Sequence, residues 1–396
     1  MLEIILALLI GILTGIITGL TPGIHINLVA VFILSLLLIS PLPIIPLLIF
    51  ITAMAITHTF MDFIPSIFLG APDEDTALGI LPGHELLLAG EGHHALKLTL
   101  IGGAIAIVTL IFLIPVFIFL MPKIYPFLQR MMAFFLIWIS IFLIYHEKGF
   151  KIKATIIFIL SGFLGIAVFN LEIGQPLLPL LTGLFGTSTI IHSIRCKTVI
   201  PKQQTKKRKI NKRHIIKPTI ATIIVSPICS FFPGLGSSQA AIIGSKITGK
   251  LNREQFLILL GSINTLIMSL SFVTLFLFQK SRTGAAFAIS QITQLSKTSL
   301  IAIIVTIFIT TIIIIPVSLI ISKIIAKHIH KIPYIKISIF ILLFLTIIVI
   351  YFTGILGLIT LIVATILGLT CIEFGTRRGF LMGAILIPTI IFYLPF

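Results

Sequence analysis

Two short segments of the sequence combine a Pro-Gly pair with polar side chains inside apolar stretches. The first contains Thr21, Pro22, Gly23, His25 and Asn27, and the second contains Pro233, Gly234, Gly236, Ser237, Ser238 and Gln239. Proline removes a backbone donor and glycine adopts angles that other residues avoid, so each pair predicts a break in a helix. A helix that begins after such a break presents unpaired amides and the positive end of its dipole. We therefore predict a substrate site for a small anion where the two segments meet.

The same segments have a simpler interpretation as packing features. Gly15 and Gly19 would allow two helices to approach closely, and the Pro-Gly pairs would be kinks. Polar residues follow both breaks, which favours the binding site over this alternative.

A third candidate feature is an acidic residue inside an apolar run. Asp62 lies four residues after His58 and four before Ser66, so the three share one face of a helix. An ionisable group inside a membrane is costly and is usually functional. The spacing predicts a site that couples transport to protons or Na+, with a structural hydrogen bond as the alternative. The corresponding part of the second half contains Asn264 and Thr265, which we add to the predicted substrate site.

Acidic residues and histidines also gather between Asp62 and Glu91, a range that holds six of the 11 acids. Asp73 and Asp75 belong to this stretch and are predicted to act in coupling or gating. No spacing here matches a metal-ligand motif, so a hydrated gating loop is favoured over a divalent-metal site. We predict no cofactor besides a coupling Na+ or H+, and no catalytic residue.

The composition determines what kind of molecule positions these groups. Of the 396 residues, 58% are hydrophobic and only 10% are charged, and the mean hydropathy is +1.24. Soluble enzymes, nucleic-acid-binding proteins and disordered proteins are therefore disfavoured. The length allows roughly a dozen membrane segments. The chain is predicted to be an all-α polytopic protein of the cytoplasmic membrane, in contact with lipid and not with nucleic acid.

Apolar runs that could cross a membrane are separated by short connectors. They fall near 2–20, 24–40, 42–69, 98–121, 131–145, 154–170, 177–194, 219–232, 236–248, 255–279, 298–322, 337–352, 354–370 and 379–395. A basic connector at 195–217 holds ten of the 28 Lys and Arg residues and separates a first repeat, 1–194, from a second repeat, 218–396.

Charge predicts the orientation of these runs. If the connector is cytoplasmic and each Pro-Gly segment forms a hairpin that enters and leaves on one side, 23 basic residues are cytoplasmic and five are outside. This split agrees with the positive-inside rule and places the N-terminus outside. Each half then has one broken hairpin and five crossings, so the halves are predicted to be inverted repeats. Such repeats are typical of alternating-access transporters.

Several motifs together resemble a known family. They are the two Pro-Gly hairpins, Gly-Ala-Pro-Asp-Glu-Asp-Thr-Ala-Leu at 70–78, Leu-Pro-Gly-His at 81–84, Ile-Asn-Thr at 263–265 and Gly-Thr-Arg-Arg-Gly at 375–379. The chain resembles the TctA-like family, the large membrane permease of tripartite tricarboxylate transporters, in its archaeal branch. The resemblance implies a secondary permease of two inverted halves. It also implies carboxylate uptake with a small membrane subunit and an extracytoplasmic binding protein. A homodimer is compatible with the sequence.

Two features depart from the family pattern. Ser226 and Ser230 occupy the positions in the second hairpin that Gly15 and Gly19 occupy in the first. The acid- and histidine-rich loop is typical of the archaeal branch rather than of citrate-type permeases, which leaves the tricarboxylate itself open.

Three functions follow from these residues. The first is secondary-active transport of a small organic anion, a carboxylate, between the two hairpin tips. The alternative is translocation of a polyprenyl-phosphate lipid carrier, because helix starts bind phosphate as readily as carboxylate. An intramembrane enzyme is disfavoured, since the sequence has no His-Glu-x-x-His motif and no paired intramembrane aspartates.

Overall fold

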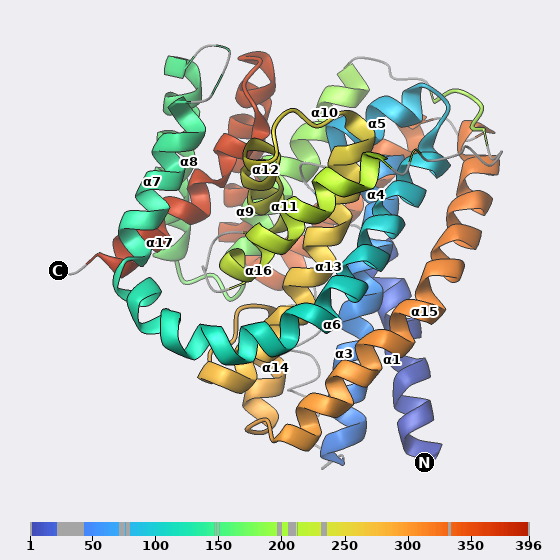
Figure 1. Ribbon diagram of the computed structural model, residues 1–396. Helices are drawn as coiled ribbons and strands as arrows, with labels where there is room; N and C mark the ends of the chain where they lie inside the picture. The colour runs from blue at the N-terminus through green and yellow to red at the C-terminus, as the bar shows by residue number, and fades with distance from the viewer. Residues whose placement is uncertain are drawn as a thin grey trace.

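The structure is a computed structural model. It describes residues 2–21, 43–70, 76, 80–145, 147, 149, 151–195, 200–204, 211, 213–230, 236–331 and 334–394. The elements within these ranges are helices, without a strand, and they form one bundle (Figure 1). The predicted all-α membrane fold is therefore confirmed.

Most of the long helices follow predicted apolar runs, whereas Ile80–Leu88 and Gly284–Ile292 are helices that were not predicted, and the predicted run 24–40 lies outside the described residues. In the first half they are α1 (Leu2–Leu20), α3 (Ile44–Met61), α4 (Phe63–Leu69), α5 (Ile80–Leu88), α6 (Gly92–Arg130), α7 (Met132–Tyr145), α8 (Lys151–Phe169), α9 (Leu177–Leu181), the π-helix η2 (Thr182–Thr187) and α10 (Ser188–Arg195). In the second half they are α11 (Arg213–Cys229), α12 (Ser237–Ile247), α13 (Arg253–Phe278), α14 (Gly284–Ile292), α15 (Lys297–His328), the 3-10 helix η3 (Ile329–Lys331), α16 (Tyr334–Glu373), the 3-10 helix η4 (Arg378–Met382) and α17 (Gly383–Tyr393). Among the described residues, eight helices are long and apolar enough to cross a membrane.

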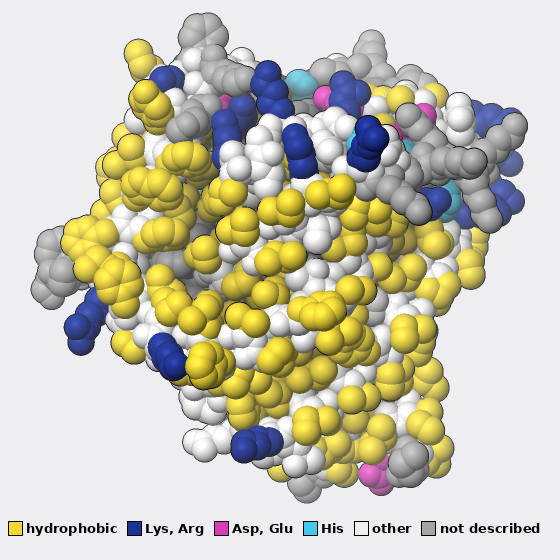
Figure 2. Space-filling model, viewed as in Figure 1, with side chains coloured by type: hydrophobic (Ala, Val, Ile, Leu, Met, Phe, Trp, Pro, Cys, Tyr) yellow, Lys and Arg dark blue, Asp and Glu magenta, His cyan; other side chains and the backbone are white. Residues whose placement is uncertain are grey.

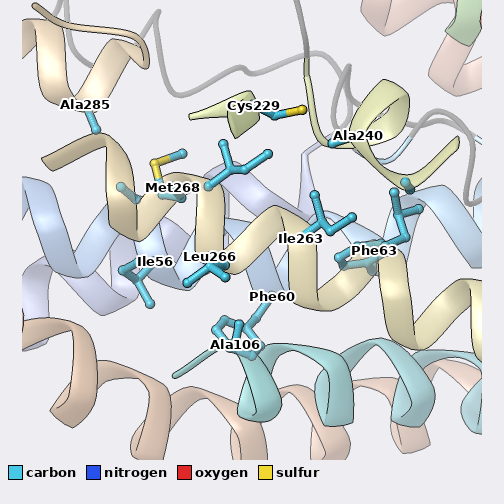
Figure 3. Close-up of a cluster of buried hydrophobic side chains, with 14 of the residues drawn as sticks. Ile56, Phe60, Phe63, Ala106, Cys229, Ala240, Ile263, Leu266, Met268 and Ala285 are labelled. Carbon is cyan, nitrogen blue, oxygen red and sulfur yellow. The ribbon is translucent and has the colours of Figure 1, made fainter. Parts of the chain in front are cut away.

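Helix α13 lies at the centre of the bundle. Asn252 and Gln255 form a capping box at its start, in which each side chain accepts a hydrogen bond from the other's backbone amide. Along its length α13 is almost wholly buried. Figure 3 shows its Ile263 and Leu266 among side chains from neighbouring helices, including Phe60 of α3 beside Ala106 of α6. Such a helix contacts protein rather than lipid on all sides.

The two predicted halves exchange contacts. Helix α3 packs on α1 of its own half and on α15 of the other half, and α13 packs on α11 and on α6. Helix α8 packs on α17, and α16 packs on α9, η2 and α10. Each half therefore completes the packing of the other.

Glycines allow the central helices to approach closely. A Cβ at Gly261 of α13 would lie 2.2 Å from the carbonyl oxygen of Thr99 on α6, and a Cβ at Gly102 would lie 2.1 Å from that of Ile258. On α1, Cβ atoms at Gly15 and Gly19 would overlap the side chains of α3. The close helix packing predicted for Gly15 and Gly19 is therefore confirmed.

Helix α16 is broken at Gly354, which has φ 62° and ψ −156°. Leu345, before the break, contacts the α10 region, where it belongs to a cluster with Ile190. Gly368, after the break, lies against Leu184 of η2 and Ser188 of α10. In a straight helix Leu345 and Gly368 would be about 35 Å apart, so the chain reverses at Gly354. The separate predicted runs 337–352 and 354–370 correspond to the two arms.

Figure 2 shows a broad hydrophobic belt with most of the visible Lys and Arg side chains along one edge, where α5 and α10 lie in Figure 1. Polar contacts at the helix ends tie the elements together. Glu254 of α13 lies 3.3 Å from Nε2 of His94 on α6 and 3.0 Å from Nδ1 of His214 on α11. Gln203 accepts a hydrogen bond from the backbone amide of Gly92 and donates one to the carbonyl of Leu87. These contacts fix the starts of three helices relative to one another.

The α6–α13 contact predicts a large effect of a single methyl group. We expect Gly261→Ala to lower the stability by about 2–3 kcal/mol, because its Cβ would meet backbone that has no flexible side chain to move. Thermal unfolding in detergent measures this. Gly186→Ala is the matched control, since its Cβ would lie 3.9 Å from the nearest atoms. Equal melting temperatures for the two variants would contradict the close approach.

The backbone angles at Gly354 lead to a second prediction, in which a substitution destabilises the protein through its conformation and not through a steric overlap. A Cβ there would meet nothing within 4 Å, but only glycine readily adopts these backbone angles. We expect Gly354→Ala to cost about 1–3 kcal/mol of stability. Gly174→Ala is the control, because it has equal open space without a positive φ. If both variants unfold like the parent protein, the reversal at Gly354 is wrong.

Candidate functional site

Asp62 lies at the junction of α3 and α4. Its angles, φ −62° and ψ −22°, are near those of a helix. Its amide donates to the His58 carbonyl at 2.9 Å, and its own carbonyl accepts from the Ser66 amide at 3.3 Å. The helix thus continues through this position, and His58, Asp62 and Ser66 have the spacing of one helical face.

The Asp62 carboxylate is buried against α13. Asp62 is 4% exposed, and Asn264 is 1% exposed. The Asn264 side-chain amide lies 3.4 Å from Oδ2 of Asp62 and 3.4 Å from the Thr59 carbonyl oxygen, as donor to both. The contact joins the two predicted halves at a buried point, since α3 belongs to the first and α13 to the second.

The start of α12 reaches the same point. Gly236 precedes the helix in an extended conformation, and Ser237 is its first residue. The Ser237 hydroxyl donates to Oδ1 of Asn264 at 3.1 Å. Ser238, also in the first turn, is buried as well. A helix N-terminus, with its positive dipole end, therefore lies one side chain away from Asp62.

The end of α1 also lies at this level. A Cβ at Gly19 would be 3.2 Å from the His58 carbonyl oxygen and 3.3 Å from the Asp62 amide nitrogen. The Thr18 hydroxyl is 3.1 Å from Nδ1 of His58. Thr21, just beyond α1, donates its hydroxyl back to the Ile17 carbonyl at 2.7 Å. Helix α1, which ends before Pro22, and helix α12, which begins after Gly234, therefore end and begin beside the His58–Asp62 segment.

Other predicted residues lie apart from this network. The Ser66 hydroxyl donates to the Thr76 carbonyl at 3.3 Å. The Thr265 hydroxyl donates to the Gly261 carbonyl. Its oxygen lies 3.2 Å from the position that a Cβ at Gly103 of α6 would take. Thr265 thus faces α6, away from Ser237.

Several predicted residues lie outside the described part of the chain. They are Pro22, Gly23, His25, Asn27, Asp73, Asp75, Pro233 and Gly234. The side chain of Gln239 lies outside it too, although its backbone belongs to the first turn of α12.

Sequence reasoning missed two groups at this site. Thr18 contacts His58, and the Thr59 carbonyl accepts from Asn264. Thr18 could have been found, because it directly precedes Gly19 in the tight interface with α3. A backbone carbonyl such as that of Thr59 leaves no signal in a sequence.

Helix α5, in the stretch predicted to gate, rests on α4 close to the site. A Cβ at Gly83 would lie 2.9 Å from the Ile67 side chain. Burial lowers the pKa of the neighbouring His84 below the ordinary histidine value, against the opposing effect of a hydrogen bond with the Ile67 backbone. Burial beside α4 therefore favours the neutral form of His84.

The C-terminal motif has a packing role in this structure. The Arg378 guanidinium donates to the Leu184 and Phe185 carbonyls at 2.9 Å each and to the Ser188 and Thr189 hydroxyls. It thereby joins η4 to the carbonyls of η2 and to the first turn of α10.

A buried carboxylate such as that of Asp62 is the kind of group that takes up a proton or a cation, and a helix start such as that of α12 is the kind of element that attracts an anion. Carboxylate, amide and hydroxyl oxygens are ligands for hard cations such as Na+ rather than for transition metals. In the described ranges, no group of three or more His, Cys, Asp or Glu side chains is placed to hold a metal ion.

Comparisons with known proteins agree with this architecture. The model of the family described as the tripartite tricarboxylate transporter TctA family matches residues 5–383. The chain is also 30% identical over 387 residues to an uncharacterised protein of Methanocaldococcus jannaschii, and the match covers 94% of each chain. No solved structure matches the chain significantly. Since the family match covers nearly the whole sequence and the helices form a multi-pass membrane bundle, this protein belongs to the TctA family of tripartite tricarboxylate transporters.

Proposed function

We propose that the protein is a secondary-active permease that moves a small organic anion, a carboxylate, across the cytoplasmic membrane, with Na+ or H+ bound at Asp62 as the coupling ion. One observation carries the proposal. The buried carboxylate of Asp62 is connected through Asn264 to Ser237 at the start of α12. In this proposal the cation site and the anion site are adjacent, so binding at one changes the electrostatic potential at the other.

Chemistry favours a carboxylate over a lipid phosphate. The family to which the chain belongs is named for tricarboxylates. The site offers hydroxyls and amides rather than a cluster of basic side chains, as expected where a coupling cation supplies the positive charge. The hairpin residues Thr21, Pro22, Gly23, His25, Asn27, Pro233, Gly234, Gly236, Ser238 and Gln239 complete the proposed binding site.

Alternating access is supported by the exchange of contacts between halves. Helix α3 packs on α15 as α13 packs on α6, which is the pairing expected of inverted repeats 1–194 and 218–396 joined by the connector 195–217. In this proposal the site lies between the repeats, and the acidic stretch with Asp73 and Asp75 gates it.

Charge supports an orientation with the connector in the cytoplasm and the N-terminus outside. The ion pairs His94–Glu254, Arg253–Glu85 and Arg377–Glu147 each join two segments that the predicted topology places on the cytoplasmic side. Lys280, assigned to the outside, lies over the ring of Tyr125, which is next to Lys123 of the same group.

The family also suggests partners. Because TctA proteins are components of tripartite transporters, we propose that a small membrane subunit and an extracytoplasmic binding protein work with this chain. The binding protein would deliver the carboxylate to the outer mouth.

Replacement of the carboxylate tests the coupling role. We expect Asp62→Asn to reduce gradient-driven citrate uptake about tenfold or more, because a hydrogen bond to a charged group contributes about 1.5–3 kcal/mol and the variant cannot carry the coupling charge. Uptake of labelled citrate into proteoliposomes, with an imposed Na+ or proton gradient, measures this. Glu373→Gln is the control, since Glu373 is exposed and pairs only at the surface with Arg195. Full uptake by Asp62→Asn, with the parent protein active, would refute the coupling role.

Removal of the hydroxyl at the helix start tests the anion site. Ser237→Ala is expected to raise the KM for citrate about fivefold, because the start of α12 loses the hydrogen bond to Asn264, worth about 1 kcal/mol, that positions it for the anion. Ser140→Ala is the matched control, as Ser140 is a buried serine on α7 whose hydroxyl bonds only to Leu136 of its own helix. An unchanged KM for Ser237→Ala would place the anion elsewhere.

A further inference from the structure

We propose that Asn264 is a positioning residue that holds the Asp62 carboxylate against the start of α12, rather than a ligand of the substrate. The hydrogen bonds of the Asn264 side chain are a property of the fold. The effect of Asn264 on transport rests on the coupling role proposed above for Asp62.

The orientation of the Asn264 side chain follows from its neighbours. The Thr59 carbonyl oxygen, 3.4 Å away, can only accept a hydrogen bond, so the amide nitrogen must face it. The same nitrogen lies 3.4 Å from Oδ2 of Asp62. Its two N–H groups therefore match two acceptors, one on the backbone and one on the carboxylate.

The other end of the amide is engaged as well. Oδ1 of Asn264 accepts the hydroxyl hydrogen of Ser237. Both donors and the carbonyl oxygen are thus used within the protein. In this arrangement no N–H of Asn264 remains for a substrate, which changes the role predicted for it from the sequence.

The position of Asn264 on α13 makes the link rigid. The residues on both sides, Ile263 and Thr265, are buried, and Gly261, one turn earlier, holds α13 against the backbone of α6. The side chain thus spans from α3 to α12 on a helix that is fixed on all sides. A proton or cation that arrives at Asp62 competes with the amide for the carboxylate, and Ser237 at the start of α12 responds to that competition.

Among the described residues, few other charges lie near the link. On α3 the nearby titratable group is His58, whose Nδ1 lies 3.1 Å from Thr18 of α1. In α11, α12, α13 and α15 the charged residues lie in the first or last two turns, α14 has none, α6 has none between Lys97 and Lys123, and α5 carries His84 and Glu85. Arg282, before α14, acts electrostatically on Cys229 at the end of α11. The parent protein has the same groups, so a pH effect that distinguishes a variant at 264 from it reports on that position.

Two substitutions of Asn264 separate the positioning role from packing. Asn264→Asp keeps the shape but replaces the donor by an acceptor, so two carboxyl groups face each other and must share a proton. Asn264→Leu keeps the volume and can share none. Ser140→Ala again serves as the control.

The first readout is thermal unfolding in detergent, which requires no transport activity. Relative to the parent protein, Asn264→Asp should lose about 3 °C or more at about pH 8 and recover most of it at about pH 5.5, where the shared proton replaces the missing donor. Asn264→Leu removes the donor but adds no second carboxyl group, so its recovery at the lower pH should be clearly smaller. The second readout is citrate uptake, which Asn264→Asp should lose at the higher pH and partly regain at the lower one.

The outcomes are distinguishable. If Asn264→Asp has the same pH profile of stability as the parent protein or as Asn264→Leu, the positioning role is wrong. If its stability shows the acid rescue but the parent protein transports no carboxylate under any gradient, the positioning role stands and the proposed function fails.

Discussion

A carboxylate buried between membrane-spanning helices must find its hydrogen-bond partners within the protein, because neither water nor lipid supplies them there. In this molecule Asp62 finds one in Asn264 of the other half of the chain. The need for such a partner fixes where α3 and α13 meet. Because Ser237 bonds to the same amide, it also fixes where α12 begins.

Close backbone contact makes that meeting possible. Hydrophobic side chains cannot drive helices together in lipid as they do in water, so small residues that permit close approach become decisive. Gly102 and Gly261 bring α6 and α13 into backbone contact, and Gly15 and Gly19 do the same for α1 and α3. Polar groups such as the Thr18 hydroxyl and the Asn264 amide can then reach across the interfaces. The glycines that allow close packing therefore also allow the polar contacts of this site.

The ends of the helices are organised by charge instead. Glu254 joins α6, α11 and α13 through two histidines, and Gln203 connects the connector to α5 and α6. These contacts lie at helix ends and are largely buried, while most of the Lys and Arg side chains visible in Figure 2 gather along one edge of the hydrophobic belt. A membrane protein of this kind uses few charges within its interior and many at its edge, because the cost of burying a charge is largest at the centre.

The sequence by itself determined the all-α membrane class and the positions of most of the long helices, and it separated the runs 337–352 and 354–370 that meet at Gly354, because hydropathy acts locally. It also identified Asp62 and Asn264 as unusual polar residues in apolar runs. Only the tertiary structure decided that the amide of Asn264 faces Asp62 and the Thr59 carbonyl, that Thr18 faces His58, and that Thr265 turns toward α6. These pairings depend on how each helix is rotated and tilted against residues distant in the chain, and on backbone atoms that are the same in every residue.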